Sequence, residues 1–270
     1  MQQTLFHKSD EKGHRLIVFV AGMPRAGSMW TYNVTREILM AGKWTVLPKL
    51  IPPNEAVLIR DALASEVNVM EVYCIKTHGK LPNPLPTRHE VKLICNFRDV
   101  RDASLSYMRF THCEFSQGLS AIKHMMDLTD YYLKAFETTT LPLRYEDITH
   151  SPIQLIDKLC AHLGVSLSDS KKREILEKYS KESIKKKLKE ISEVRLGEGG
   201  QVKGAKHQSR FESVRNFDGT YRTYEKNTAF QSNHITSKKD GEWRTAFKQD
   251  EIAQIHSLCQ HWLIEYGYQI

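Results

Sequence analysis

The feature that most constrains the fold is an apolar run followed at once by a glycine-containing loop and a helical pattern. Residues 15–21 are rich in β-branched and other apolar side chains, which is typical of a buried strand. Gly22 and Gly27 follow with the G-x-x-x-x-G spacing of a phosphate-binding loop, and residues 28–41 carry apolar side chains at helical spacing. A strand that leads through such a loop into a helix predicts that the loop lies at the carboxyl edge of a parallel sheet.

The first half of the chain continues to alternate strand-like and helix-like segments. Strands that alternate with helices predict an α/β fold in which helices flank a central parallel β-sheet. The further expected strands are 69–76, 91–97 and 141–147, and the expected helices between them are 54–65, 101–109 and 118–138.

The second half has a different character. Amphipathic helices are expected at 151–164 and 168–190, and a final helix at 249–266. Residues 192–235 are rich in glycine, serine, asparagine and basic residues with weak periodicity, which predicts a long loop region that is mobile or forms a lid. We find no internal repeat, so residues 1–270 are interpreted as one domain with a helical and loop-rich C-terminal part.

Composition narrows the functional classes. The formal net charge of +7 favours an anionic partner such as a nucleotide or a polyanion. No apolar run reaches about 18 residues and the polar N-terminus lacks the apolar centre of a secretory signal, so neither a membrane span nor secretion is expected.

The five cysteines are an odd number, and Cys74 and Cys95 lie in strand-like runs, which favours reduced thiols in a cytoplasmic protein. No clustered His/Cys spacing indicates a metal site.

The loop departs from the ATP-binding pattern in two places. A P-loop that binds ATP uses a lysine on the phosphates and a hydroxyl on magnesium, whereas Ser28 and Met29 occupy those positions. A thioether is a poor ligand for a hard cation, so Met29 is not expected to hold magnesium. Arg25 instead supplies a positive charge from within the loop. We therefore expect binding of a phosphate-like anion without magnesium. Sulfuryl transfer fits this demand, because the SO3 group carries less negative charge than a phosphoryl group.

Five segments, in order along the chain, resemble the sulfotransferases that use 3′-phosphoadenosine 5′-phosphosulfate (PAPS). They are residues 24–30, similar to the 5′-phosphosulfate loop; 74–78, similar to the strand that ends in K-T-H; 97–107, similar to the R-x-x-[RK]-D-x-x-x-S-Y segment; 144–147, similar to the Y-E-D strand end; and 238–244, similar to the C-terminal G-x-x-G-[DE]-W-[KR] loop. The resemblance covers most of the chain. It implies a P-loop-NTPase-like fold, PAPS as sulfuryl donor and 3′-phosphoadenosine 5′-phosphate (PAP) as product.

The resemblance also implies a set of donor-binding residues. They are Arg25, Ala26, Gly27, Ser28, Met29, Trp30, Arg98, Ser106, Tyr145, Lys238 and Lys239. Arg25 would contact the 5′-phosphosulfate, and the backbone amides of residues 26–30 would surround the 5′-phosphate. Trp30 would stack on adenine with Tyr145 nearby. The pair Arg98 and Ser106 would bind the 3′-phosphate, with help from one of the two lysines.

Three side chains are expected to act in catalysis. His78 matches the general base of the family, and a histidine can take the proton of an acceptor hydroxyl near neutral pH. Lys76 lies two residues earlier, on the same face of the strand, and could neutralise charge on the sulfuryl oxygens together with Arg25. The implied reaction is a single in-line displacement with neither a metal nor a covalent enzyme intermediate.

Two departures from the family pattern concern the donor site. Met29 replaces a hydroxyl of the loop, and residues 236–238 read Thr-Ser-Lys where the family has R-K-G.

The acceptor is left open by the sequence. The segments 42–60, 78–90, 108–120 and 192–235 are expected to form its walls, and their mixed composition favours a hydroxyl or amine of a small polar molecule, such as a bacterial secondary metabolite. A monomer or homodimer without nucleic-acid or membrane partners is expected. Two alternatives are a degenerate P-loop kinase and a non-catalytic module that binds anions or nucleic acid.

Overall fold

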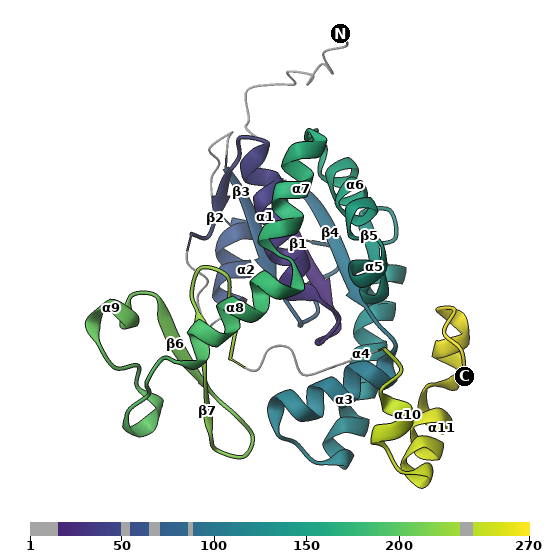
Figure 1. Ribbon diagram of the computed structural model, residues 1–270. Helices are drawn as coiled ribbons and strands as arrows, with labels where there is room; N and C mark the ends of the chain where they lie inside the picture. Colours follow the sequence, from purple (N-terminus) through teal and green to yellow (C-terminus); the bar gives the residue numbers. More distant parts are fainter. Residues whose placement is uncertain (1–15, 50–54, 65–70, 86–88, 233–239) are drawn as a thin grey trace.

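The structure, a computed structural model, describes residues 16–49, 55–64, 71–85, 89–232 and 240–270. A five-stranded parallel sheet forms its centre (Figure 1), in the order β2-β3-β1-β4-β5. The strands are β1 (Leu16–Gly22), β2 (Thr45–Leu47), β3 (Glu71–Lys76), β4 (Glu90–Phe97) and β5 (Thr140–Arg144). The predicted α/β architecture is confirmed. β1 lies between β3 and β4, so the loop after β1 is at the centre of the carboxyl edge, where ligands bind in such sheets.

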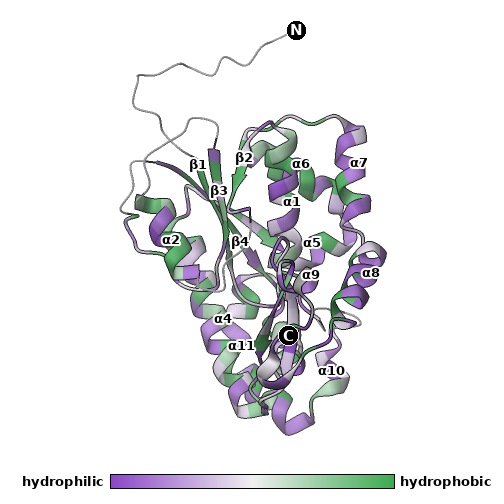
Figure 2. Cartoon of the chain, turned by 90° about the vertical axis from the view of Figure 1, so that its left-hand side faces the viewer, coloured by the Kyte–Doolittle hydropathy of each residue, from purple (hydrophilic) through white to green (hydrophobic). Residues whose placement is uncertain are grey.

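Helices cover both faces of the sheet because β1 is apolar on both sides. Its residues Leu16, Val18 and Val20 are buried in one cluster with α1 (Ser28–Ala41) and α6 (Pro152–Leu163). The alternate residues Ile17, Phe19 and Ala21 are buried in a second cluster with α2 (Glu55–Ala64) and α4 (Phe115–Ala135). Successive side chains of a strand point to opposite faces, so one short run anchors both helical layers. Figure 2 shows the apolar colouring concentrated in the strands and on the inner sides of these helices.

A third buried cluster lies beyond the carboxyl edge of the sheet. It joins α3 (Val100–Thr111) and part of α4 to the C-terminal helices α10 (Trp243–Ala246) and α11 (Gln249–Glu265). The buried guanidinium of Arg101 donates to both carboxylate oxygens of Asp99 and to the carbonyl of Gln269. The last residues of the chain are therefore bound to the start of α3, the helix that carries several candidate site residues.

Two predicted elements differ in the structure, and one strand was not predicted. The expected helix 168–190 is two helices, α7 (Asp169–Lys178) and α8 (Lys181–Ser192), because Ser180 caps a new helix by accepting the Ser183 amide. The expected strand 141–147 ends at Arg144, and Tyr145 begins the short helix α5 (Tyr145–His150). β2 was not predicted, since three residues are too short to produce a recognisable alternation.

The prediction of a long loop over 192–235 is wrong for much of that region. It contains the 3-10 turn η1 (Glu198–Gly200), the short helix α9 (Ala205–Gln208) and an antiparallel hairpin of β6 (Phe211–Arg215) and β7 (Tyr221–Glu225). Figure 1 shows this hairpin apart from the main sheet, at the lower left. Buried Phe211 and Phe230 attach the region to the cluster of α1 and α8. The strands of the hairpin contain several polar and charged residues, so the alternation of apolar and polar side chains that predicts a strand is weak.

Within the described ranges, no helix has the combined length and apolar character that a membrane span requires.

Candidate active site

The loop between β1 and α1 is held against the end of β4. Gly22 has φ +105°, and a Cβ at this position would lie 2.3 Å from the Asn96 carbonyl oxygen. The next residue, Met23, donates its amide to that same oxygen at 3.1 Å. Only glycine combines this φ with such close approach of two backbones. Contacts with β4 thus fix the path of the loop without the help of a ligand.

Arg25 adopts a left-handed backbone conformation inside this loop. Its φ of 67° is uncommon for a side-chain-bearing residue and costs on the order of 1–3 kcal/mol. Its Nε donates to Ser106 Oγ at 3.0 Å, and its guanidinium carbon lies 4.2 Å from the ring centroid of Phe110. Burial, together with the positive charges of Arg98 and Arg222, lowers the pKa of Arg25 to about 9. The guanidinium is therefore fixed on α3 in a strongly positive environment.

The start of α1 has the properties of an anion-binding site. Gly27, with φ +79°, precedes the first turn, and the first amides of a helix have no intrahelical acceptor. A Cβ on Gly27 would lie 2.5 Å from the Ile148 side chain, so the loop packs tightly under α5. Ala26, Ser28 and Met29 are buried around this turn. Amides, a cation and a hydroxyl suit a phosphate or sulfate group.

His78 follows β3 and lies beside the loop. Its Nδ1 is 2.9 Å from the Gly22 carbonyl oxygen, so the nitrogen that donates there is Nδ1 and the opposite Nε2 is an acceptor. Nε2 lies 3.5 Å from Ser28 Oγ. Burial lowers the pKa of His78 to about 3, with a further contribution from the charge of Lys76. The imidazole is therefore neutral, with its unprotonated nitrogen toward the loop.

Lys76 ends β3 one residue before Thr77. Burial lowers the pKa of Lys76 to about 8, which the negative charge of Glu55 opposes. Glu55, the first residue of α2, accepts a hydrogen bond from Thr77 Oγ1 at 3.0 Å. The sequence analysis did not identify Glu55. Nothing in the sequence indicated it, because Glu55 lies in no motif and its contact with Thr77 is a tertiary one.

Arg98 lies at the end of β4 and is almost completely buried. Its guanidinium is 3.9 Å from the ring centroid of Tyr145 and forms an ion pair with Asp240 at 3.2 Å, while Asp102 is 4.0 Å away. Burial raises the pKa of Asp102, and its carboxylate accepts the amides of Gly241 and Trp243 at 2.6 and 3.2 Å. The chain before α10 is therefore bound to the start of α3, close to Arg98.

The remaining predicted donor residues have mixed outcomes. Ser106 lies on α3 and is buried, in contact with Arg25. Trp30 is buried in the core cluster of α1, and its indole N–H donates to the Tyr179 carbonyl at 3.2 Å. Its stacking on adenine stays a prediction. Lys238 and Lys239 lie outside the described residues.

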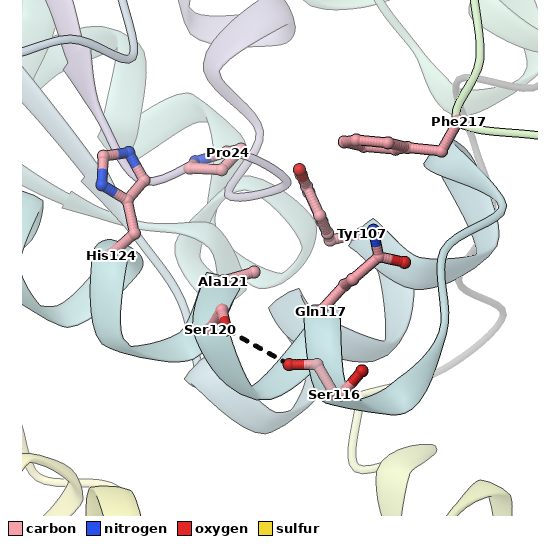
Figure 3. A pocket seen from close by; sticks show the side chains of 8 residues that line it. All are labelled: Pro24, Tyr107, Ser116, Gln117, Ser120, Ala121, His124 and Phe217. Carbon is pink, nitrogen blue, oxygen red and sulfur yellow. Dashed lines mark hydrogen bonds between the residues drawn. The ribbon is translucent and has the colours of Figure 1, made fainter.

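A cavity of about 460 Å³ opens next to the loop (Figure 3). Its lining combines aromatic, aliphatic and neutral polar side chains: Pro24, Tyr107, Ser116, Gln117, Ser120, Ala121, His124 and Phe217. Phe217 comes from the turn between β6 and β7, and the α4 residues form the opposite side (Figure 3). Pro24 connects the cavity to the loop, and His124 is near enough to His78 to affect its pKa. We refer to the space that these eight residues line as the acceptor cavity, after the role that is proposed for it below.

The described residues contain no cluster of three or more His, Cys, Asp or Glu side chains suited to a metal ion.

Comparisons with known proteins agree with this arrangement. The family described as "Sulfotransferase domain" matches residues 17–267. A crystal structure of retinol dehydratase in complex with androsterone and PAP aligns with a TM-score of 0.55 and 17% identity, covering 92% of this chain and 80% of that one. Mouse sulfotransferase SULT7A1 complexed with PAP aligns with a TM-score of 0.56 and 15% identity, covering 93% and 85%. No curated protein matches the chain.

Proposed function

The chain belongs to the sulfotransferase family, and from this premise we propose that it transfers the sulfuryl group of PAPS to a hydroxyl or amine of a small acceptor. The observation that carries the proposal is the arrangement around Gly22. Its carbonyl orients His78 while the loop that follows it presents Arg25 and the start of α1. A base and an anion-binding loop therefore lie side by side at the centre of the sheet edge.

The residues of the loop fit the sulfated end of such a donor. Arg25 can form two parallel hydrogen bonds with anionic oxygens, and the amides at the start of α1 add donors that need no metal. Arg98 and Ser106 lie on the α3 side and suit the 3′-phosphate. Both similar crystal structures named above hold PAP, which supports this choice of nucleotide.

The proposed chemistry assigns separate tasks to His78 and Lys76. PAPS supplies an activated sulfuryl group, which the acceptor oxygen or nitrogen attacks in line. His78 Nε2 takes the acceptor proton, because the Gly22 carbonyl keeps the proton of the neutral ring on Nδ1. Lys76 and Arg25 stabilise the negative charge that moves toward the sulfuryl oxygens and the leaving phosphate. The negative charge of a bound donor raises the pKa of His78 from its low value in the free protein.

The acceptor cavity favours an uncharged acceptor. The described part of its lining has no lysine, arginine or carboxylate, and Tyr107 and Phe217 present aromatic surface. Ser116, Gln117, Ser120 and His124 supply polar groups that can orient a hydroxyl or amine. A cavity of this size lies within the range that small molecules occupy, about 300–1,000 Å³. The aromatic lining supports an acceptor with an aromatic part, in addition to the hydroxyl or amine expected from the sequence. A role in secondary metabolism stays a prediction.

The first experiment measures thermal stability with PAP, with AMP, and with ATP plus magnesium. A ligand that binds only the folded state raises the melting temperature by mass action. We expect PAP to stabilise the protein more than AMP, and Arg98→Gln to remove that difference. Arg109→Gln, at an exposed arginine on the helix that follows Arg98, is the matched control. A larger effect of ATP with magnesium would support the kinase alternative instead.

The second experiment measures transfer itself. The protein is incubated with PAPS and a panel of neutral phenols, alcohols, amines and sugars, and PAP formation is followed. We expect the highest rate with an uncharged aromatic acceptor, because the cavity lining is neutral and partly aromatic. Tight binding of PAP without turnover of any panel member would argue for a non-catalytic anion-binding protein.

A further inference from the structure

Arg222 is a third arginine near the loop, and it comes from the hairpin. It lies on β7, half-buried, and its guanidinium carbon is 4.4 Å from the ring centroid of Phe110. The guanidinium of Arg25 lies 4.2 Å from the same centroid. One aromatic ring on α3 is thus shared by a loop arginine and a hairpin arginine. No motif of the sequence pointed to Arg222.

Among the described residues, two side chains accept hydrogen bonds from Arg222. Its Nε donates to Gln231 Oε1 at 2.6 Å, and its Nη1 donates to Asn216 Oδ1. Both acceptors are neutral amide oxygens. Arg222 and Arg98 each lower the pKa of Arg25 by electrostatic repulsion, so both guanidinium groups lie within electrostatic reach of Arg25. Arg98 is paired with Asp240, whereas Arg25 and Arg222 bring two like charges to one ring, at a cost in free energy that an anion between them would recover.

The hairpin is docked in a way that fixes this arrangement. The amide of Phe217 donates to the Thr111 carbonyl at 3.3 Å, and Asp218 pairs with His112 at 2.5 Å. Thr111 and His112 directly follow Phe110 at the end of α3. Ser106, one turn before Phe110, accepts the hydrogen bond from Arg25. The last two turns of α3 therefore hold the loop on one side and the hairpin on the other.

We propose that Arg222 is a further donor-binding residue, which adds a positive charge at the 5′-phosphosulfate end of the donor. This inference rests on the proposed function. The target chemistry is the sulfated or phosphorylated 5′ end of an adenine nucleotide, because Arg222 shares the Phe110 ring with the loop arginine. Arg98 is instead assigned to the 3′-phosphate. The two arginines should therefore respond differently to nucleotides that differ at one end only.

The experiment measures dissociation constants of adenosine, AMP, adenosine 5′-phosphosulfate and PAP by calorimetry. The variants are Arg222→Met, which keeps a long side chain over Phe110 without the charge, and Arg222→Lys, which keeps the charge. Arg215→Met is the matched control, because Arg215 is an exposed arginine on the partner strand of the same hairpin.

We expect Arg222→Met to weaken the binding of AMP, adenosine 5′-phosphosulfate and PAP by a similar factor. The factor should be about tenfold, which is the size of a charge-assisted contact. Adenosine should bind with unchanged affinity, and Arg222→Lys should restore most of the loss. Arg215→Met should leave all four affinities as in the wild type.

Two results would overturn the inference. Unchanged affinities in Arg222→Met would mean that its charge does not reach the donor. An equal loss of affinity for adenosine and AMP in Arg222→Met, which Arg222→Lys does not restore, would mean that Arg222 only holds the hairpin in place. Failure of the proposed function is seen separately, since the wild-type protein would then show no preference for PAP over AMP.

Discussion

The donor side of the site lies where β1, β3 and β4 end, whereas the acceptor cavity is formed by the surface of α4 and the turn of a hairpin. On the donor side, Gly22, Ser28 and Arg98 are buried, and backbone contacts fix the loop. In the acceptor cavity, Ser116, Ser120, His124 and Phe217 are exposed. One half of the site is thus part of the core and the other half is part of the surface. Substitutions should therefore separate donor binding from acceptor use.

We expect the largest effect on kcat from a substitution of His78, which lies at the border between the donor side and the acceptor cavity. His78→Gln should lower kcat by about 10²–10⁴-fold, because a glutamine cannot take the acceptor proton. The dissociation constant of PAP should stay unchanged, since the loop and Arg98 are intact. Steady-state rates with the best acceptor of the panel and calorimetry with PAP measure the two quantities. His261→Gln, at an exposed position on α11, is the control. A parallel loss of PAP affinity would contradict the proposed division of tasks.

The pH dependence of the rate should be set by the donor side. The pKa of Lys76 is about 8, so its charge is present below that pH and is lost as the pH rises through it. The value of kcat/KM for PAPS should then fall up to tenfold per pH unit on the alkaline side. His78, with a pKa of about 3, is neutral throughout the range from pH 5 to 8 and should produce no decline on the acidic side.

A pH profile of the wild type and of Lys76→Arg tests this assignment. Because an arginine holds its proton more strongly than a lysine, the alkaline decline should move to higher pH in the variant. A decline centred between pH 6 and 7 would show instead that protonation of a histidine controls the rate.

A smaller effect is expected on the acceptor side alone. Phe217→Ala should raise KM for the best acceptor of the panel by roughly three- to tenfold, the value of one aromatic contact. PAP affinity should not change. Ile264→Ala is a suitable control, because Ile264 is an apolar residue that is 61% exposed, compared with 64% for Phe217. If Phe217→Ala weakened the binding of PAP instead, the turn of the hairpin would belong to the donor side.

The smallest expected effect concerns the ion pair of Arg98 with Asp240. Because a 3′-phosphate must compete with this carboxylate, Asp240→Asn should tighten PAP binding by up to about fivefold, as for a partly exposed ion pair. AMP, which lacks the 3′-phosphate, should bind as before. Asp250→Asn on α11 provides the control, and calorimetry gives both constants. Equal changes for PAP and AMP would show that the carboxylate acts on the whole nucleotide.

The donor side could be predicted largely from the sequence because its residues belong to short segments. The spacing of Gly22 and Gly27 and the K-T-H triplet each place a side chain relative to the end of a strand. The end of a parallel strand is at the ligand-binding edge wherever it occurs in the chain. The parallel sheet followed from the same local patterns, and only the three-residue β2 was missed.

The acceptor cavity could be predicted only in part. Four of its lining residues lie in the segments 108–120 and 192–235 that were expected to form acceptor walls, namely Ser116, Gln117, Ser120 and Phe217. Which side chains of these segments meet is decided by tertiary packing. Phe217 meets α4 only because the hairpin docks on the end of α3, about a hundred residues earlier in the chain. Glu55 and Arg222 were missed for the same reason, since neither lies in a motif. The broken helix at Ser180 is a different kind of error. There a serine cap interrupted a continuous amphipathic pattern, and the cap outweighed the periodicity.

The exposed face of α4 has a consequence for how the substrate range of such a chain can change. Gly22 and Gly27 have no room for a side chain, so these two positions of the donor loop have almost no freedom to vary. Ser116, Ser120 and His124 are exposed, and substitutions at exposed positions usually alter stability by less than about 0.5 kcal/mol. A library restricted to these three positions would therefore sample new acceptor shapes without endangering the fold. Divergence and laboratory selection can act on the same few surface residues while the donor chemistry is retained.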